Sequence, residues 1–153
     1  MLELFKDVDL TQEAAAWMAQ GLRALASCDG LHTSELALVE AFERELGIDP
    51  TDPADFNATV SPLTGATEAE LFVRSLQLMA LADGRISARE EEWIAGVSGN
   101  LGVDAGRRAE LAIESKKYLL SSLAGVSAFR DQAEGIGRSL GLSPEDIASV
   151  LDA

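Results

Sequence analysis

The sequence predicts an all-α protein: one compact single-domain bundle of about seven helices with an internally duplicated helical hairpin. Apolar residues recur at helical spacing, and no segment alternates with a period of two over a useful length. Aromatic residues make up only 5% of a chain rich in Ala and Leu, which favours helix packing over strands. The 153 residues contain no linker long enough to separate domains, so we expect one domain over 1–153.

The first predicted hairpin joins two helices through Asp29-Gly30. Thr11 can cap a helix over about 12–27, because it precedes an apolar stripe at helical spacing. A second helix is expected over about 34–46, with Gly47 as a left-handed cap. The following segment contains two prolines and predicts a turn with room for one short helical piece.

The second predicted hairpin has Asp83-Gly84 at its turn. Thr67 and Glu70 have the spacing of a capping box, which predicts that they open the helix before this turn. Ser87 and Glu90 have the same spacing and are expected to open the helix after it.

Three more helices are predicted after the second hairpin. Asp104 can cap a long helix to about residue 123, and Ser127 can cap another to about residue 140. Ser143, with Pro144 at the first helical position, predicts a last helix to about residue 151.

The two hairpins, approximately 12–49 and 67–104, have the pattern of an internal repeat, with the C-terminal helices in 105–152. Aligning Asp29-Gly30 with Asp83-Gly84 matches apolar positions on both sides and, after one extra residue in the second turn, places Glu35 on Glu90. The matched core positions include Leu22 with Leu76, Val39 with Ile94 and Phe42 with Val97. Because one hairpin cannot cover its own apolar stripe, we expect the copies to pack face to face, with their acidic turns facing water.

Asp29, Glu35, Asp83 and Glu90 are the candidate metal ligands, because carboxylates are the donors that Ca²⁺, Mg²⁺ and Mn²⁺ prefer. The simpler interpretation is that Gly supplies a positive φ, Asp bonds the turn and Glu caps the next helix. The second turn matches the second half of an EF-hand loop, but its first ligand positions would be apolar. An EF-hand is therefore rejected, and the first two interpretations stay open.

The first turn also offers a softer donor set of Cys28, His32 and Glu35. The second turn has Ala82 in place of Cys28 and no histidine. Since an isolated Cys at a helix end is usually a small buried hydrophobe, this set is the weaker candidate. A single cysteine also excludes an internal disulfide and suits a reducing, cytoplasmic compartment.

Two segments resemble the TerB-like proteins associated with tellurite resistance: Ala-Ser-Cys-Asp-Gly-Leu-His-Thr-Ser-Glu and Ala-Leu-Ala-Asp-Gly-Arg-Ile-Ser-Ala-Arg-Glu, each followed by an amphipathic helix ending at Leu-Gly. The resemblance covers about residues 12–104. It implies a cytoplasmic helical protein with an acidic surface cluster for divalent cations, acting in stress-response or membrane-linked complexes rather than as a catalyst. The family motif falls on Asp29, Gly30, Glu35, Asp83, Gly84 and Glu90.

The formal net charge of −14 disfavours nucleic acid and anionic membranes as partners and suits cations or a basic protein. Residues 1–60 carry −9 of this charge, and residues 61–153 carry −5. One basic cluster could pair with the acidic half of a second copy in a homodimer or form a solvated face; it contains Arg107, Arg108, Lys116 and Lys117. We see no signal peptide or membrane span, which predicts a protein without direct membrane insertion.

The leading hypothesis is a TerB-like binding or scaffold module that is not an enzyme. It would bind a divalent cation weakly or not at all and act through other proteins, basic or membrane-associated. The single His and single Cys share one tight turn without an orienting third group, which disfavours nucleophilic catalysis. Two alternatives are a small carboxylate-dependent hydrolase with a cleft between the hairpins and an adaptor with an apolar groove for a partner helix.

Overall fold

The computed structural model describes residues 2–28, 30, 33–50, 52–83, 86–124 and 130–152, and all regular secondary structure in these ranges is helical. The α-helices found there are α1 (Gln12–Ala26), α2 (Thr33–Leu46), α3 (Ala66–Ala80), α4 (Ala88–Asn100), α5 (Ala105–Ala124), α6 (Arg130–Ser139) and α7 (Pro144–Leu151). Short 3-10 helices are η1 (Leu2–Phe5), η2 (Pro53–Asp55) and η3 (Leu81–Asp83). The prediction of an all-α bundle with about seven helices is confirmed.

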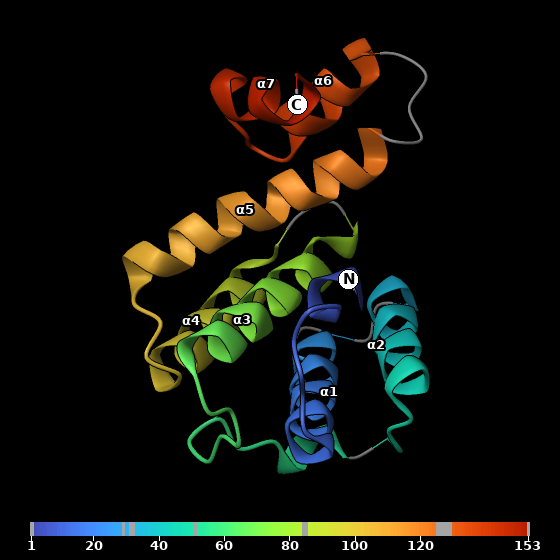
Figure 1. Ribbon diagram of the computed structural model, residues 1–153, viewed down its shortest axis with the longest axis vertical. Helices are drawn as coiled ribbons and strands as arrows, with labels where there is room; N and C mark the ends of the chain where they lie inside the picture. The colour runs from blue at the N-terminus through green and yellow to red at the C-terminus, as the bar shows by residue number, and fades with distance from the viewer. Residues whose placement is uncertain are drawn as a thin grey trace.

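Helix α5 lies between two groups of helices (Figure 1). On one side it contacts α3 and α4, which pack with α1 and α2, and on the other side it contacts α6 and α7. Helix pairs α1–α2 and α3–α4 occur where the sequence predicted the two hairpins. That they are copies of one unit remains a prediction.

The larger hydrophobic core lies among α1, α2, α3 and α4 and includes Leu111 of α5. Four residues that the repeat placed in the core are buried there: Val39, Phe42, Ile94 and Val97. The smaller core joins the C-terminal half of α5 to α6 and α7, and its buried residues are Leu81, Leu120, Ala133, Leu140, Leu142 and Ile147. Because Leu81 belongs to η3, the smaller core reaches the second Asp-Gly turn.

Two glycines allow helices to approach closely. A Cβ added at Gly21 of α1 would lie 2.6 Å from the ring of Phe72 on α3. A Cβ at Gly137 of α6 would lie 2.6 Å from Cγ1 of Ile147 on α7. Both distances are shorter than any side chain tolerates, so these positions require glycine for packing rather than for backbone freedom.

Most predicted helix starts are confirmed by hydrogen bonds. Backbone N–H groups donate to the side chains of Thr11 at 3.1 Å, Asp104 at 2.7 Å and Ser143 at 3.1 Å. The Ser87–Glu90 capping box is complete. The predicted start at Ser127 lies outside the described residues.

The predicted capping box of Thr67 and Glu70 is wrong. Helix α3 begins at Ala66, and its N-cap is Gly65, which has no side chain to accept a hydrogen bond. Glu70 instead binds Arg107 of α5, because α5 packs along α3 and places a guanidinium within reach. The carboxylate of Glu70, which the local spacing assigned to a cap, thus forms a long-range ion pair.

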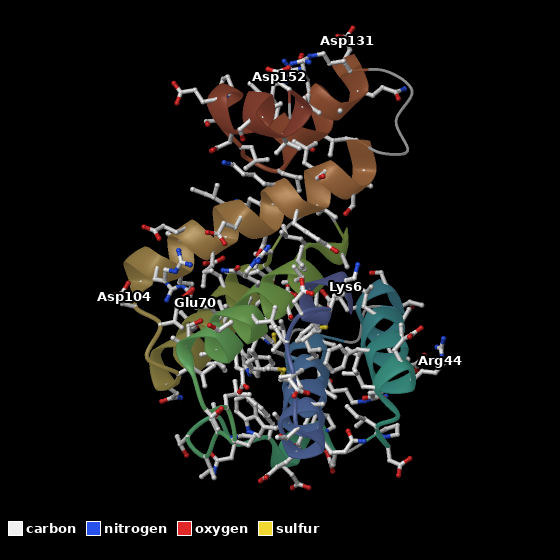
Figure 2. All side chains as sticks on the ribbon, in the orientation of Figure 1. Lys6, Arg44, Glu70, Asp104, Asp131 and Asp152 are labelled. Carbon is white, nitrogen blue, oxygen red and sulfur yellow. The ribbon has the colours of Figure 1, made fainter. Side chains whose placement is uncertain are left out.

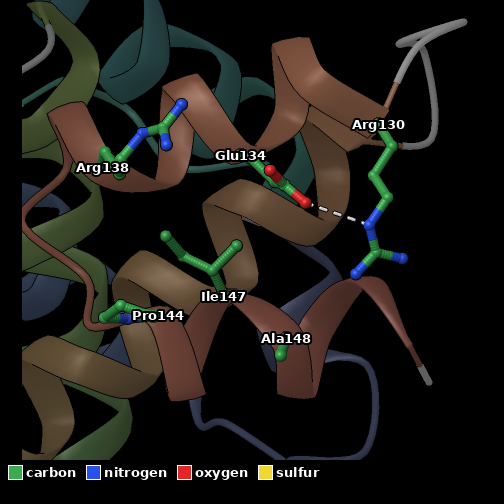
Figure 3. A pocket seen from close by; sticks show the side chains of 6 residues that line it. All are labelled: Arg130, Glu134, Arg138, Pro144, Ile147 and Ala148. Atoms are coloured by element: carbon green, nitrogen blue, oxygen red, sulfur yellow. Dashed lines mark hydrogen bonds and ion pairs between the residues drawn. The ribbon is translucent and has the colours of Figure 1, made fainter.

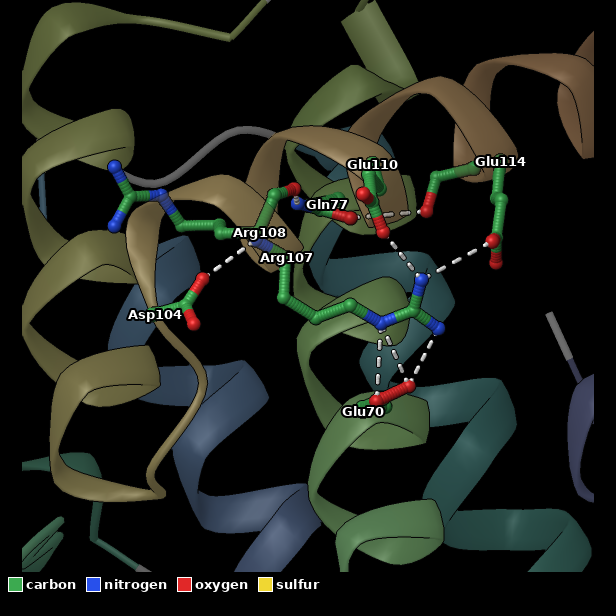
Figure 4. A network of polar contacts seen from close by, with 8 residues as sticks. Glu70, Gln77, Asp104, Arg107, Arg108, Glu110 and Glu114 are labelled. Carbon is green, nitrogen blue, oxygen red and sulfur yellow. Dashed lines mark hydrogen bonds and ion pairs between the residues drawn. The ribbon is translucent and has the colours of Figure 1, made fainter.

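A polar network joins α3 to α5 (Figure 4). Arg107 Nη2 lies 2.6 Å from Glu70 Oε1, and Nη1 lies 2.8 Å from Glu110 Oε2. Buried Ser115 donates to Gln77 Oε1 at 3.0 Å, and Gln77 Nε2 donates to the Arg108 carbonyl at 3.2 Å. Side chains thereby fix the position of α5 on the first four helices.

Many charged side chains lie on the outside of the bundle, as Arg44, Asp131 and Asp152 do in Figure 2. Two cations of the predicted basic cluster pair within the chain: Arg107 with Glu70, and Lys117 with Asp146 at 2.8 Å. Among the described residues, no helix is both long enough and apolar enough to cross a membrane.

Candidate functional site

The described elements that flank the two Asp-Gly turns lie at the same end of the first four helices. Helix α2 begins just after the first turn, and it contacts η3, which starts the second turn. In Figure 1 the C-terminal end of α1, the N-terminal end of α2 and η3 lie at one end of the four-helix group. This arrangement is the one that a site shared between the turns requires.

Glu90 occupies the first turn of α4 and caps this helix. Its Oε1 accepts a hydrogen bond from the Ser87 N–H at 2.9 Å, and its own N–H donates to Ser87 Oγ at 3.2 Å. The side chain is 1% exposed, and Oε2 is buried without a hydrogen-bond partner among the described residues. The capping interpretation therefore accounts for one of the two carboxylate oxygens.

Glu35 lies in the first turn of α2, the position that the repeat aligns with Glu90. It is fully buried, with 0% exposure. The expectation that both acidic turns face water is therefore wrong for the glutamates of these turns. Each lies on the inward side of its helix, and for Glu90 the cap folds the carboxylate back onto the backbone.

Asp29 lies outside the described residues, and so does the side chain of Asp83. Gly30 has a φ of +112°, in the left-handed region, as predicted for the first turn. Within the described ranges, no group of three or more His, Cys, Asp and Glu side chains could hold a metal ion. The complete four-carboxylate site therefore remains a prediction, with Glu35 and Glu90 as its described members.

The softer donor set of Cys28, His32 and Glu35 is described only in part. Cys28 is half-buried and Glu35 is fully buried, whereas His32 lies outside the described residues. This set also stays a prediction.

A cavity of about 190 Å³ lies between α6 and α7, away from the hairpin turns (Figure 3). Its walls combine Arg130, Glu134 and Arg138 of α6 with Pro144, Ile147 and Ala148 of α7. Arg130 Nε donates to Glu134 Oε1 at 3.0 Å along α6. No sequence pattern indicated this cavity, because it depends on how α6 packs against α7.

A carboxylate-dependent hydrolase needs a carboxyl group with a raised pKa. In the described part of the chain, Glu70 and Asp146 have pKa values that are shifted downward instead. Hydrogen bonding to Arg107 lowers the pKa of Glu70, and hydrogen bonding to Lys117 lowers that of Asp146. These two groups therefore suit ion pairing rather than proton donation.

Large apolar side chains on the described surface are few. Val60, before α3, is 69% exposed, and Ile113, on α5, is 41% exposed. They belong to separate segments, whereas a groove for a partner helix needs a row of such side chains along one face. No particular groove for an adaptor follows from these two residues.

Comparisons of the chain with models of known protein families, with curated proteins and with solved structures found no match. The TerB-like resemblance therefore rests on the two motifs and their spacing.

Proposed function

We propose that the chain is a TerB-like binding module that holds a divalent cation at its paired Asp-Gly turns and acts through contacts with other proteins. The supporting observation is Glu90, whose Oε2 is buried without a hydrogen-bond partner among the described residues. A capping glutamate needs only one oxygen for its cap, and that role is filled by Oε1.

Leaving a buried acceptor unsatisfied costs roughly 1–3 kcal/mol, and more for a charged group. A bound cation removes this cost, since it coordinates the second oxygen directly. Glu35 occupies the matching position in α2 and is also buried, and α2 contacts η3 beside the second turn. Asp29 and Asp83 would complete a set of four carboxylates, which suits Ca²⁺, Mg²⁺ or Mn²⁺.

The charge distribution supports a basic protein as the partner. The chain carries a formal charge of −14, and Arg107 and Lys117 are already paired with carboxylates of the same chain. The acidic excess is therefore left for an external cation or a basic surface. A cytoplasmic role in stress response, as the TerB-like resemblance implies, belongs to the same proposal.

Calorimetry and thermal unfolding with calcium, magnesium and manganese test the cation site. We expect at least one ion to release or absorb heat and to raise the Tm of the wild-type protein at millimolar concentration. Glu90→Gln keeps an oxygen for the cap but removes the charge, so it should lose the ion-dependent rise. Glu91→Gln is the matched control, because Glu91 lies in the same helical turn and is exposed.

The absence of both heat and a Tm change with all three ions would remove the cation from the proposal. If Glu90→Gln and Glu91→Gln lost the Tm rise equally, the stabilisation by the ions would depend on the net charge of the protein and not on a site at Glu90.

A further inference from the structure

A second pocket, distinct from the turns, lies where the N-terminal segment crosses α3 and α5. It has a volume of about 260 Å³. Its apolar walls come from Leu4 and Val8 of the N-terminal segment, Leu71 of α3 and Leu111 of α5. Arg74 of α3 also lines the pocket, and none of the sequence motifs includes this residue.

The guanidinium of Arg74 has one buried donor that is unsatisfied within the described part of the chain. Its Nε is buried and has no hydrogen-bond partner among the described residues. An arginine stays charged at all physiological pH values, so this donor cannot become neutral to avoid the cost of burial. An unsatisfied buried donor beside a cavity needs an acceptor, which a water molecule or a ligand in the pocket can supply.

The reason that Arg74 is left over is the competition for Glu70. A glutamate four residues before an arginine on a helix is its favoured ion-pair partner, and Glu70 has this spacing. Both oxygens of Glu70 instead accept from Arg107, with Nε contacts of 3.0 and 3.1 Å. Glu114, which lines the same pocket, lies 3.6 Å from Arg107.

Figure 4 shows Glu70, Glu110 and Glu114 arranged around the guanidinium of Arg107. Three carboxylates thus gather at one arginine of the α3–α5 junction, and in the described residues none forms an ion pair with Arg74.

We propose that this pocket binds a small organic monocarboxylate with an apolar body, and that Arg74 is the residue that binds its carboxylate. A planar carboxylate matches the fork of donors of a guanidinium. The leucine and valine walls suit an apolar body, and the volume is below that of pockets for drug-sized ligands. The neighbouring glutamates repel any anion, and they repel a doubly charged phosphate more strongly than a singly charged carboxylate.

Hexanoate and hexanamide are the probes, because they share the apolar body and differ in charge. Titration of the ¹⁵N- and methyl-labelled full chain by NMR follows the Arg74 Nε–H and the methyl groups of Leu4, Val8 and Leu111. We expect hexanoate to shift these signals at millimolar concentration. Hexanamide should bind at least about tenfold more weakly, because it lacks the charge-assisted hydrogen bonds.

Arg74→Met keeps the apolar stem and removes the guanidinium, so it should weaken hexanoate binding by about tenfold or more. Arg89→Met is the matched control: it removes the same charge from an exposed position on α4 and should bind hexanoate as the wild type does.

Several outcomes would overturn the proposal: no shift at millimolar hexanoate, equal binding of acid and amide, equal weakening in both variants, or shifts confined to residues outside the pocket. If Arg74→Met does not fold, the comparison of hexanoate with hexanamide on the wild-type protein still tests whether the pocket recognises a carboxylate. Divalent cations are left out of these titrations, so the result is independent of the cation site at the turns.

Discussion

Arg107 of α5 binds both carboxylate oxygens of Glu70 on α3, with Nη2 2.6 Å from Oε1 and Nε 3.1 Å from Oε2. The two residues are 37 positions apart in the chain. Their ion pair attaches the long helix to the first four helices, and it leaves Arg74 without its nearest helical partner.

This pair should make stability depend on pH in the acidic range. The hydrogen bond to Arg107 lowers the pKa of Glu70 below its ordinary value of 4.5, so the folded protein favours the ionised carboxylate. The contribution of the ion pair to the free energy of unfolding is fully present above the pKa that Glu70 has in the unfolded chain. It is lost as the pH falls through the lower pKa that Glu70 has in the folded protein. Its size is modest, because both side chains are partly exposed to solvent.

Urea denaturation of wild type and Glu70→Gln between neutral and acidic pH measures this contribution. The wild type should be more stable at pH 7, with a difference that shrinks below about pH 4.5 and at high salt. Glu92→Gln, at an exposed position of α4, is the control. A difference that grows toward acidic pH would contradict the assignment.

The two predicted capping boxes should respond differently to mutation. Ser87→Ala removes the acceptor for the Glu90 N–H and should lower the free energy of unfolding by about 1 kcal/mol. Thr67→Ala changes an exposed residue inside α3, which has Gly65 as its N-cap, so it should lower stability by much less. Equal losses in urea denaturation would mean that Thr67 caps α3 in solution.

Two glycines of α6 should give effects of opposite sign. Gly137→Ala places a Cβ 2.6 Å from Ile147 Cγ1, and the resulting overpacking should cost about 1–3 kcal/mol. Gly135→Ala meets nothing within 4 Å and should stabilise the helix by about 0.5–1 kcal/mol. Thermal unfolding of the two variants checks this, and a stabilised Gly137→Ala would contradict the close contact of α6 with α7.

The larger core should depend strongly on Phe42, which is fully buried and contacts Phe5 with ring centroids 5.3 Å apart. Phe42→Ala should lower the free energy of unfolding by about 3–5 kcal/mol. Val60→Ala, at an exposed position, should change it by less than about 0.5 kcal/mol. A small effect at Phe42, measured by urea denaturation, would mean that α2 is not packed as described.

Local sequence patterns predicted the helices well because their signals lie within one turn of each helix end. Thr11, Ser87 and Ser143 each accept a hydrogen bond from a backbone N–H three residues later, and this spacing is visible in the sequence. The positive φ values of Gly47 and Gly102 follow equally from the Leu-Gly pairs at the ends of helices.

The features that the sequence missed depend on contacts between distant segments. Glu70 has the spacing of a capping residue, but it forms an ion pair with Arg107 because α5 packs on α3. The burial of Glu35 and Glu90 depends on which side of each helix faces the core. Of the predicted metal ligands, two glutamates are thus placed, whereas Asp29 and the side chain of Asp83 lie outside the described residues.

Leu81 links the packing of the C-terminal helices to the second turn. Leu81 comes just before that turn and is buried with Leu120 and Ile147, and Ile86 just after the turn contacts both cores. A molecule that displaced α6 and α7 would remove the packing of Leu81 and so weaken the anchor of the turn that precedes Glu90. By thermodynamic reciprocity, a cation at the turn and any molecule that displaced α6 and α7 would change each other's affinity by the same factor.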